Sequence, residues 1–268
     1  MAVVISNNLV LLDRFTGEPL NHARIGYAKI SGTITASSSA PGYPASDADY
    51  EMTYNYWKPQ TMPATWEVDP GGNTACTYMA IAAHTFGTDG ATVSAQFWNG
   101  TQWVTLATSS PLAGDDSPIM FIFSELAATK YRIFISGSTP PRVGVIYIGK
   151  TLDMQRAIYG GNSPITLSRE TVTRPTISER GQWLGRSIIR AGSTGSWSWQ
   201  NLKAAWYRAN FDPFVEHART KPFFIAWRPE TFPDEIAYCW TNSDISPTNQ
   251  GVADFMSVTL NAKGLGIE

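Results

Sequence analysis

The fold of this chain is decided by residues 76–107, CTYMAIAAHTFGTDGATVSAQFWNGTQWVTLA. This stretch holds three short apolar runs separated by the turns GTDG and NG: Cys76–His84, Ala91–Trp98 and Gln102–Ala107. Asn-Gly between alternating apolar residues is the strongest short-range signal for a β-hairpin. Each run is also shorter than a typical helix. The stretch therefore predicts antiparallel strands joined by tight turns.

The same pattern continues through IMFIF, KYRIFIS and RVGVIYIG. In KYRIFIS the apolar residues Tyr131, Ile133 and Ile135 alternate with a mixed set, so one face of that strand is apolar. Short strands at this spacing, without a helix-length pattern between them, predict a β-sandwich or jelly roll. We expect residues 46–155 to form this sandwich and to fold independently. Residues 1–45 are expected to be an N-terminal strand followed by an extended arm or linker.

Residues 156–268 form the expected second unit. ITLSRETVTRP and GRSIIRAGSTGSWSWQ predict strands, and later stretches such as FFIAW and IAYCW return to the strand pattern. Between them, residues 201–219 predict one or two short helices, with Asp212 as the N-cap and Pro213 at the first helical position. The sequence thus predicts a mainly β chain, with a sandwich and a second β domain that carries a short helix.

Composition excludes several classes of function. The chain has 268 residues, 43% of them hydrophobic and 16% charged, which is typical of a globular protein. Its net charge of -2, without a run of like charge, lacks the basic footprint of a nucleic-acid binder. No stretch approaches the ~20 apolar residues of a membrane helix, and the N-terminus MAVVISNNLVLLDRF lacks the basic region of a signal peptide. Cys76 and Cys239 lie in apolar strand patterns, so we expect free thiols rather than a disulfide.

One stretch contains residue types that occur in catalytic and metal sites. Residues 214–240, FVEHARTKPFFIAWRPETFPDEIAYCW, place His217, Cys239 and several carboxylates close together in the sequence. A zinc site needs another Cys or His at short spacing, which is missing. A Cys-His nucleophile pair is conceivable, but a histidine at a helix end and a cysteine packed as a small hydrophobe explain both residues. We expect no catalytic residue, no metal and no cofactor, and therefore no enzyme.

Candidate ligand-binding residues come from the sandwich. Tyr56 and Trp57 precede its first strands, Asp89 lies in the GTDG turn, and Asp115 and Asp116 precede IMFIF. Aromatic rings stack on the apolar faces of sugars, and carboxylates bind hydroxyl groups or calcium. The same aromatic residues could instead fill the core, and paired Asp residues commonly form Asx-turns.

The residues also resemble known families. The segments TMPATWEVD, CTYMAIAAHTFGTDGATVSAQFWNGTQW, KYRIFISG and RVGVIYIGKTL resemble the galactose-binding-like (discoidin-type) jelly roll, in the version carried by minor tail proteins of long-tailed bacteriophages of Gram-negative hosts. The segments RGQWLGRSIIRAG and FDPFVEHARTKPFFIAWRPETFPDEIAYCW are similar to the core domain of distal tail proteins. In many of those proteins the ring-forming domain comes first, whereas here the order is reversed or the sandwich is inserted after a short N-terminal strand.

This resemblance implies a structural virion protein of a siphovirus-type tail tip or baseplate. Its expected partners are further copies of itself in a ring, most simply a hexamer, together with the tail tube protein and the tail hub and tip proteins. It would assemble in the host cytoplasm, remain in the virion, and touch host surface carbohydrate as a secondary role. The alternative is a non-catalytic, lectin-like carbohydrate-binding protein.

Overall fold

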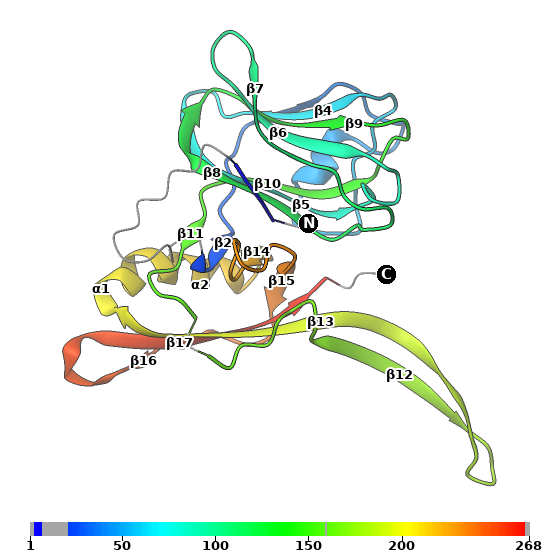
Figure 1. The fold of residues 1–268 in the computed structure, drawn as a ribbon, viewed down its shortest axis with the longest axis vertical. Coiled ribbons are helices and arrows are strands. Elements are labelled where there is room, and N and C mark those ends of the chain that lie inside the picture. Colours follow the sequence, from blue (N-terminus) through cyan, green and yellow to red (C-terminus); the bar gives the residue numbers. More distant parts are fainter. Residues whose placement is uncertain (1–2, 7–20, 159, 266–268) are drawn as a thin grey trace.

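The computed structural model describes residues 3–6, 21–158 and 160–265 (Figure 1). Within them, a four-stranded and a five-stranded sheet pack face to face as a sandwich. An eight-stranded sheet with a short helical segment forms a second unit. The expected fold class is confirmed: the chain is mainly β, with a sandwich and a second β domain.

The sandwich strands run in two sheets. The four-stranded sheet has the order β1-β8-β5-β10, with bounds Val3–Ile5, Ile119–Ala128, Thr74–His84 and Val143–Gly149. The five-stranded sheet has the order β3-β4-β9-β6-β7, with bounds Thr33–Ala36, Ala64–Asp69, Tyr131–Ser136, Thr92–Trp98 and Trp103–Ser109. All pairings are antiparallel except β1 with β8, which is parallel.

Alternating side chains build the sandwich core. In β9, Tyr131, Ile133 and Ile135 are fully buried, as the alternation in KYRIFIS predicts. The expected hairpin at Asn99-Gly100 is confirmed between β6 and β7. The Asn99 side chain accepts hydrogen bonds from the amides of Thr101 and Gln102. Gly100 has φ of 99°, a conformation that favours glycine.

The second unit is one long sheet. Its order is β11-β2-β14-β15-β17-β13-β12, with β16 beside β17. The bounds in that order are Leu152–Asp153, Arg24–Gly26, Phe223–Ala226, Ile236–Thr241, Phe255–Gly264, Trp183–Lys203 and Arg169–Ile177, and β16 is Thr248–Asn249. Apart from β1, the sandwich strands are thus inserted between β2 and β11, which pair with each other.

The β14 strand shows how the two units are joined. Phe223 and Ile225 point into the core of the second unit, whereas Phe224 and Ala226 point into a core shared with the sandwich. A strand that is buried on both faces reads as a continuous apolar run, which explains FFIA. The shared core contains residues of both units, among them Tyr147 of β10 and Tyr238 of β15. It argues against independent folding of the sandwich.

The helical segment covers one face of the eight-stranded sheet. It runs continuously through α1 (Ala204–Trp206), a π-helical turn (Tyr207–Phe211) and α2 (Asp212–Ala218). The prediction that Asp212 caps a new helix is wrong, because Asp212 has helical φ and ψ and its amide donates to the carbonyl of Tyr207. The π turn lies directly before Pro213, which has no amide hydrogen to continue the α-helical pattern.

The N-terminal residues contribute strands to both units. The prediction that residues 1–45 lie outside the sandwich is wrong for β1 and β3, which belong to its two sheets. Their short length and the Ser/Gly-rich context of β3 hide the pairing from sequence. By contrast, β2 pairs with β14 of the second unit. Two 3-10 turns complete the elements, at Ala45–Asp49 and Gly251–Ala253.

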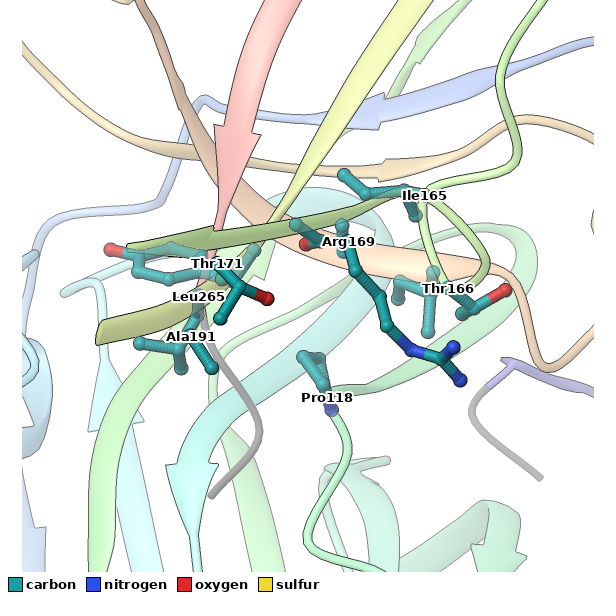
Figure 2. A pocket seen from close by; sticks show the side chains of 12 residues that line it. Pro118, Ile165, Thr166, Arg169, Thr171, Ala191 and Leu265 are labelled. Carbon is teal, nitrogen blue, oxygen red and sulfur yellow. The ribbon is translucent and has the colours of Figure 1, made fainter. Parts of the chain in front are cut away.

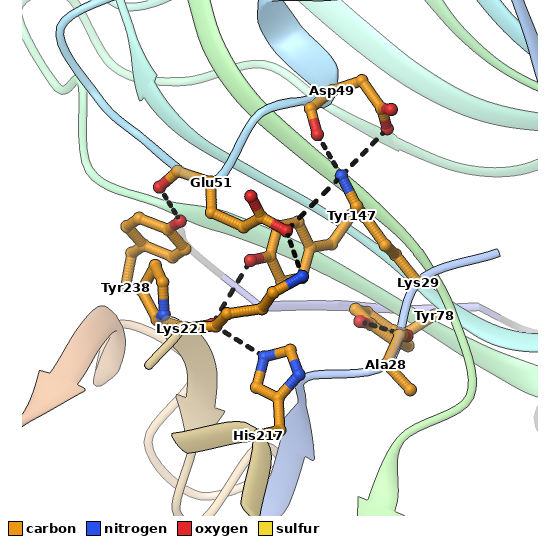
Figure 3. Close-up of polar contacts among 10 residues, drawn as sticks. Ala28, Lys29, Asp49, Glu51, Tyr78, Tyr147, His217, Lys221 and Tyr238 are labelled. Carbon is orange, nitrogen blue, oxygen red and sulfur yellow. Dashed lines mark hydrogen bonds and ion pairs between the residues drawn. The ribbon is translucent and has the colours of Figure 1, made fainter. Parts of the chain in front are cut away.

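Polar contacts close the junction between the units (Figure 3). The Glu51 carboxylate pairs with Lys221 of the second unit, 3.1 Å away, and the Glu51 carbonyl accepts the Tyr238 hydroxyl. Partial burial alone would raise the pKa of Glu51, but the bond from Lys221 and the charge of Lys29 lower it below its ordinary value. Tyr147 donates to the Pro222 carbonyl at 3.2 Å. The junction is therefore both apolar and hydrogen-bonded.

Both cysteines are buried free thiols, as expected. No helix in the described part of the chain is both long enough and apolar enough to span a lipid bilayer.

Candidate functional site

The loops at one end of the sandwich hold most of the predicted binding residues. Asp116 accepts hydrogen bonds from the amides of Gly87 and Thr88, at 2.9 and 3.0 Å, and from the Thr88 hydroxyl. A Cβ at Gly87 would lie 2.3 Å from the carbonyl oxygen of Asp115, so only glycine permits this close approach. Asp116 thus ties the β5–β6 loop to the β7–β8 loop.

The other two carboxylates bond within their own loops. Asp89 accepts from the Thr85 hydroxyl at 2.5 Å, and that hydroxyl accepts the amide of Arg142. Asp115 accepts from the amide of Ser117, an Asx-turn bond. In the described residues no group of three or more His, Cys, Asp or Glu side chains gathers around a possible metal position. The turn-forming explanation thus holds for Asp115, whereas Asp116 links two loops, and ligand binding by these aspartates stays a prediction.

An aromatic pair lies beside these loops. The rings of Tyr43 and Tyr56 stack with centroids 4.6 Å apart, and the Arg142 guanidinium lies 5.5 Å from the Tyr56 ring. Tyr43 is exposed and Tyr56 half-buried. Tyr43 and Arg142 were not predicted, since a tyrosine in a Gly/Pro-rich segment and an arginine after two prolines carry no distinctive signal.

Trp57 is not a surface residue. It has no exposed surface, it bridges to Val143 of β10, and its indole N–H donates to the Ser38 carbonyl. The prediction that Trp57 stacks on a ligand is therefore wrong, and the core alternative holds for it. The structure brings Tyr56 and Asp89 together through Arg142 and Thr85. Asp115 and Asp116 lie on the adjoining loop.

The His217 and Cys239 side chains do not form a reactive pair. Cys239 is completely buried, and burial raises the pKa of its thiol well above the usual value. A thiol held protonated in this way is a poor nucleophile. His217 lies 3.3 Å from the Pro222 carbonyl and packs edge-on against Tyr27, and burial lowers its pKa. Packing explains both residues.

The most exposed apolar surface belongs to a long hairpin, which we call the arm: residues 169–190, formed by β12, its turn and the first part of β13. Along Ser193–Lys203, β13 pairs with β17, but its first part pairs only with β12. Figure 1 shows the arm projecting from the second unit, away from the sandwich. Its large apolar side chains are 40–69% exposed: Val172, Ile177, Trp183, Leu184, Ile188 and Ile189.

A groove separates the root of the arm from the sandwich (Figure 2). It has a volume of about 340 Å³ and runs between Pro118, just before β8, and Arg169 and Ala191 at the start of the arm. Its lining is largely apolar, and Arg169 extends across it. The groove leaves the arm without support from the sandwich.

Comparisons with known proteins find similar solved structures but no match in sequence. No family model matches the sequence, and no curated protein matches it significantly. Among solved structures, chitosan-binding module 1 of a chitosanase/glucanase from Paenibacillus sp. IK-5 is 18% identical, covering 47% of this chain and 98% of the module, with a TM-score of 0.38. Module 2 of the same enzyme, solved with chitotriose, is 14% identical (45% and 98%, TM-score 0.39), and a pectin-binding carbohydrate-binding module is 13% identical (45% and 91%, TM-score 0.39). Identity this low says nothing of what this chain binds.

Proposed function

We propose that this chain is a structural subunit of a multi-copy assembly, held together through its arm. This proposal is supported above all by the exposed apolar surface of the arm. An isolated two-stranded hairpin is at best marginally stable in water. A contiguous exposed apolar patch usually marks an interaction site. Trp183, at 69% exposed, and Ile189, at 66%, belong to none of the buried clusters of the described residues.

We propose more specifically that this assembly is part of a phage tail tip. The arm lies within the part of the chain whose sequence resembles distal tail proteins, and a ring of such subunits would join the tail tube to the tip complex. The tail-tip proposal is supported by the sequence resemblance and by the exposed apolar surface of the arm. Purified virions examined by electron microscopy and mass spectrometry test it. The protein is expected there as a closed ring, in six copies for a hexameric tube, and its absence from virions would contradict the tail proposal.

Shortening the arm is expected to abolish self-association without unfolding the chain. Thr173 and Ile188 are paired across the arm, so residues 174–187 can be replaced by Asn-Gly, which closes a two-residue hairpin turn. The removed residues contribute nothing to the buried clusters, so the melting temperature should remain within a few degrees of the parent value. Light scattering should show the parent protein well above 29.4 kDa and the shortened protein as a monomer. A parent protein that is monomeric at every concentration would argue against this role.

A second candidate function, non-catalytic carbohydrate binding, is favoured by the loop end of the sandwich. The stacked Tyr43 and Tyr56 rings offer an apolar platform, and Arg142 supplies hydrogen-bond donors beside it. Aromatic faces with adjacent polar groups suit the C–H faces and hydroxyls of a sugar. The three aspartates are engaged in loop contacts, so the platform and Arg142 would provide most of the binding energy.

Titration with sugars tests this candidate. Calorimetry with chitosan oligosaccharides and with lipopolysaccharide fragments should show saturable binding. It should weaken about five- to thirtyfold in Tyr43→Ala, since an exposed aromatic contact is worth about 1–2 kcal/mol. Leu112→Ala, at a 74% exposed side chain outside the platform, is the matched control. Absence of saturable binding to any of these ligands would remove the candidate and leave the assembly proposal unaffected.

A further inference from the structure

Resting on the proposed assembly, we propose that the arm of one copy docks on residues 43–54 of a second copy, so that copies join head to tail. We call these residues the tyrosine segment. In the described part of the chain, large exposed apolar side chains gather at two places, the arm and this segment. Tyr50, Met52 and Tyr54 are 54%, 56% and 73% exposed, and Tyr43 is 36% exposed.

The two surfaces carry opposite charge. The arm has five arginines and two glutamates, a net charge of +3; since the chain carries -2, all remaining residues together carry -5. The tyrosine segment contains Asp47, Asp49 and Glu51 and no basic residue. Asp49 and Glu51 pair with lysines, whereas Asp47 makes no ion pair within the residues that the structure describes. Complementary charge favours the encounter of the two surfaces and sets its orientation.

The side-chain chemistry also matches. Tyrosine, tryptophan and arginine are the residues most enriched at the centres of protein interfaces. Guanidinium groups stack on tyrosine rings, an arrangement that this chain already forms between Arg142 and Tyr56. Arginines and Trp183 on the arm would make similar contacts with Tyr50 and Tyr54, while Ile188 and Ile189 cover the remaining apolar surface.

Both surfaces cannot meet within one copy. The tyrosine segment is fixed to the sandwich, because it leads into buried Trp57, and to the junction, where Glu51 binds Lys221. The arm projects from the other unit, away from the sandwich (Figure 1). Contact between two different surfaces of identical chains is heterologous and builds a ring or a filament. A specific interface uses about 20–30 residues a side, and the arm has 22 residues.

The experiment uses two variants of the full chain and one control. The arm variant is Trp183→Ala/Ile188→Ala, and the segment variant is Tyr50→Ala/Tyr54→Ala. The control is Leu112→Ala, which removes an equally exposed side chain outside both surfaces. By analytical ultracentrifugation the parent and the control should form the same oligomer. Each variant should self-associate at least tenfold more weakly than the parent.

Mixing the two variants gives the sharpest result. The segment variant keeps an intact arm and the arm variant keeps an intact segment, so one good contact remains, and the mixture should form a 1:1 dimer and nothing larger. This inference would be overturned if the mixture stayed monomeric or if the segment variant assembled like the parent. The role of the arm in assembly would not be affected by either result. A parent protein without self-association, or an arm variant that assembles normally, would overturn the proposed function as well.

Discussion

Tyr147→Ala is expected to destabilise the whole chain by about 3–5 kcal/mol, the range for removing a fully buried aromatic side chain. Tyr147 lies in a sandwich strand, but its ring packs edge-on against Phe224 and Tyr238 of the second unit, at 5.4 and 6.1 Å. Its hydroxyl also donates to the Pro222 carbonyl. Truncation therefore opens a cavity in the core that the two units share, so both should lose stability together.

Urea unfolding followed by tryptophan fluorescence and by far-ultraviolet circular dichroism measures this effect. Both signals should shift to the same lower midpoint. Tyr147→Phe, which keeps the ring, should lose only about 1 kcal/mol for the hydrogen bond, and Tyr54→Ala, at an exposed tyrosine, should change stability by less than about 0.5 kcal/mol. Two separate transitions, with only one shifted by Tyr147→Ala, would mean that the units unfold independently after all.

This joint core could not be predicted from the sequence. The patterns in KYRIFIS and around Asn99-Gly100 predict strands and a hairpin correctly, because period-two burial and turn chemistry are local properties. Pairing between distant segments is not local. The sequence FFIA does not indicate that the two faces of this strand pack into two different cores. A three-residue run such as Arg24–Gly26 is too short to be identified as a strand of the second sheet.

In the candidate site, too, local features could be predicted from the sequence and contacts between distant segments could not. Asp89, Asp115 and Asp116 lie in loops, as the sequence predicts, and Asp115 forms the expected Asx-turn. The bond from Gly87 to Asp116 across two loops could not be predicted, and ligand binding by these aspartates stays a prediction. Trp57 was misplaced because an aromatic residue in a polar segment has the same sequence signature whether it lies on the surface or fills a core. The exposure of the arm also escaped prediction, since Ile188 and Ile189 would suit a buried strand equally well.

Acid is expected to destabilise the chain through His84. This imidazole ends β5, is fully buried against Phe86, and accepts the Phe86 amide at Nδ1. Burial lowers its pKa to about 4, although the nearby charges of Asp116 and Asp115 act in the opposite direction. The unfolded chain, with an ordinary histidine pKa near 6.5, binds a proton at a higher pH than the folded chain does.

The unfolded state therefore gains protons first as the pH falls. The contribution of neutral His84 is fully present above pH 6.5 and is lost progressively as the pH falls to about 4, by up to about 3 kcal/mol. His84→Asn keeps an acceptor for the Phe86 amide but does not titrate, so its unfolding free energy, although lower at pH 7.5, should fall much less between pH 6.5 and 4 than that of the parent. Carboxylates titrate in both proteins and cancel in the comparison. Because His84 directly precedes the β5–β6 loop, which Asp116 ties to the β7–β8 loop, the same loss should open the β5–β6 loop to hydrogen exchange before the rest of the sandwich. Parallel pH profiles for parent and variant would rule out this assignment.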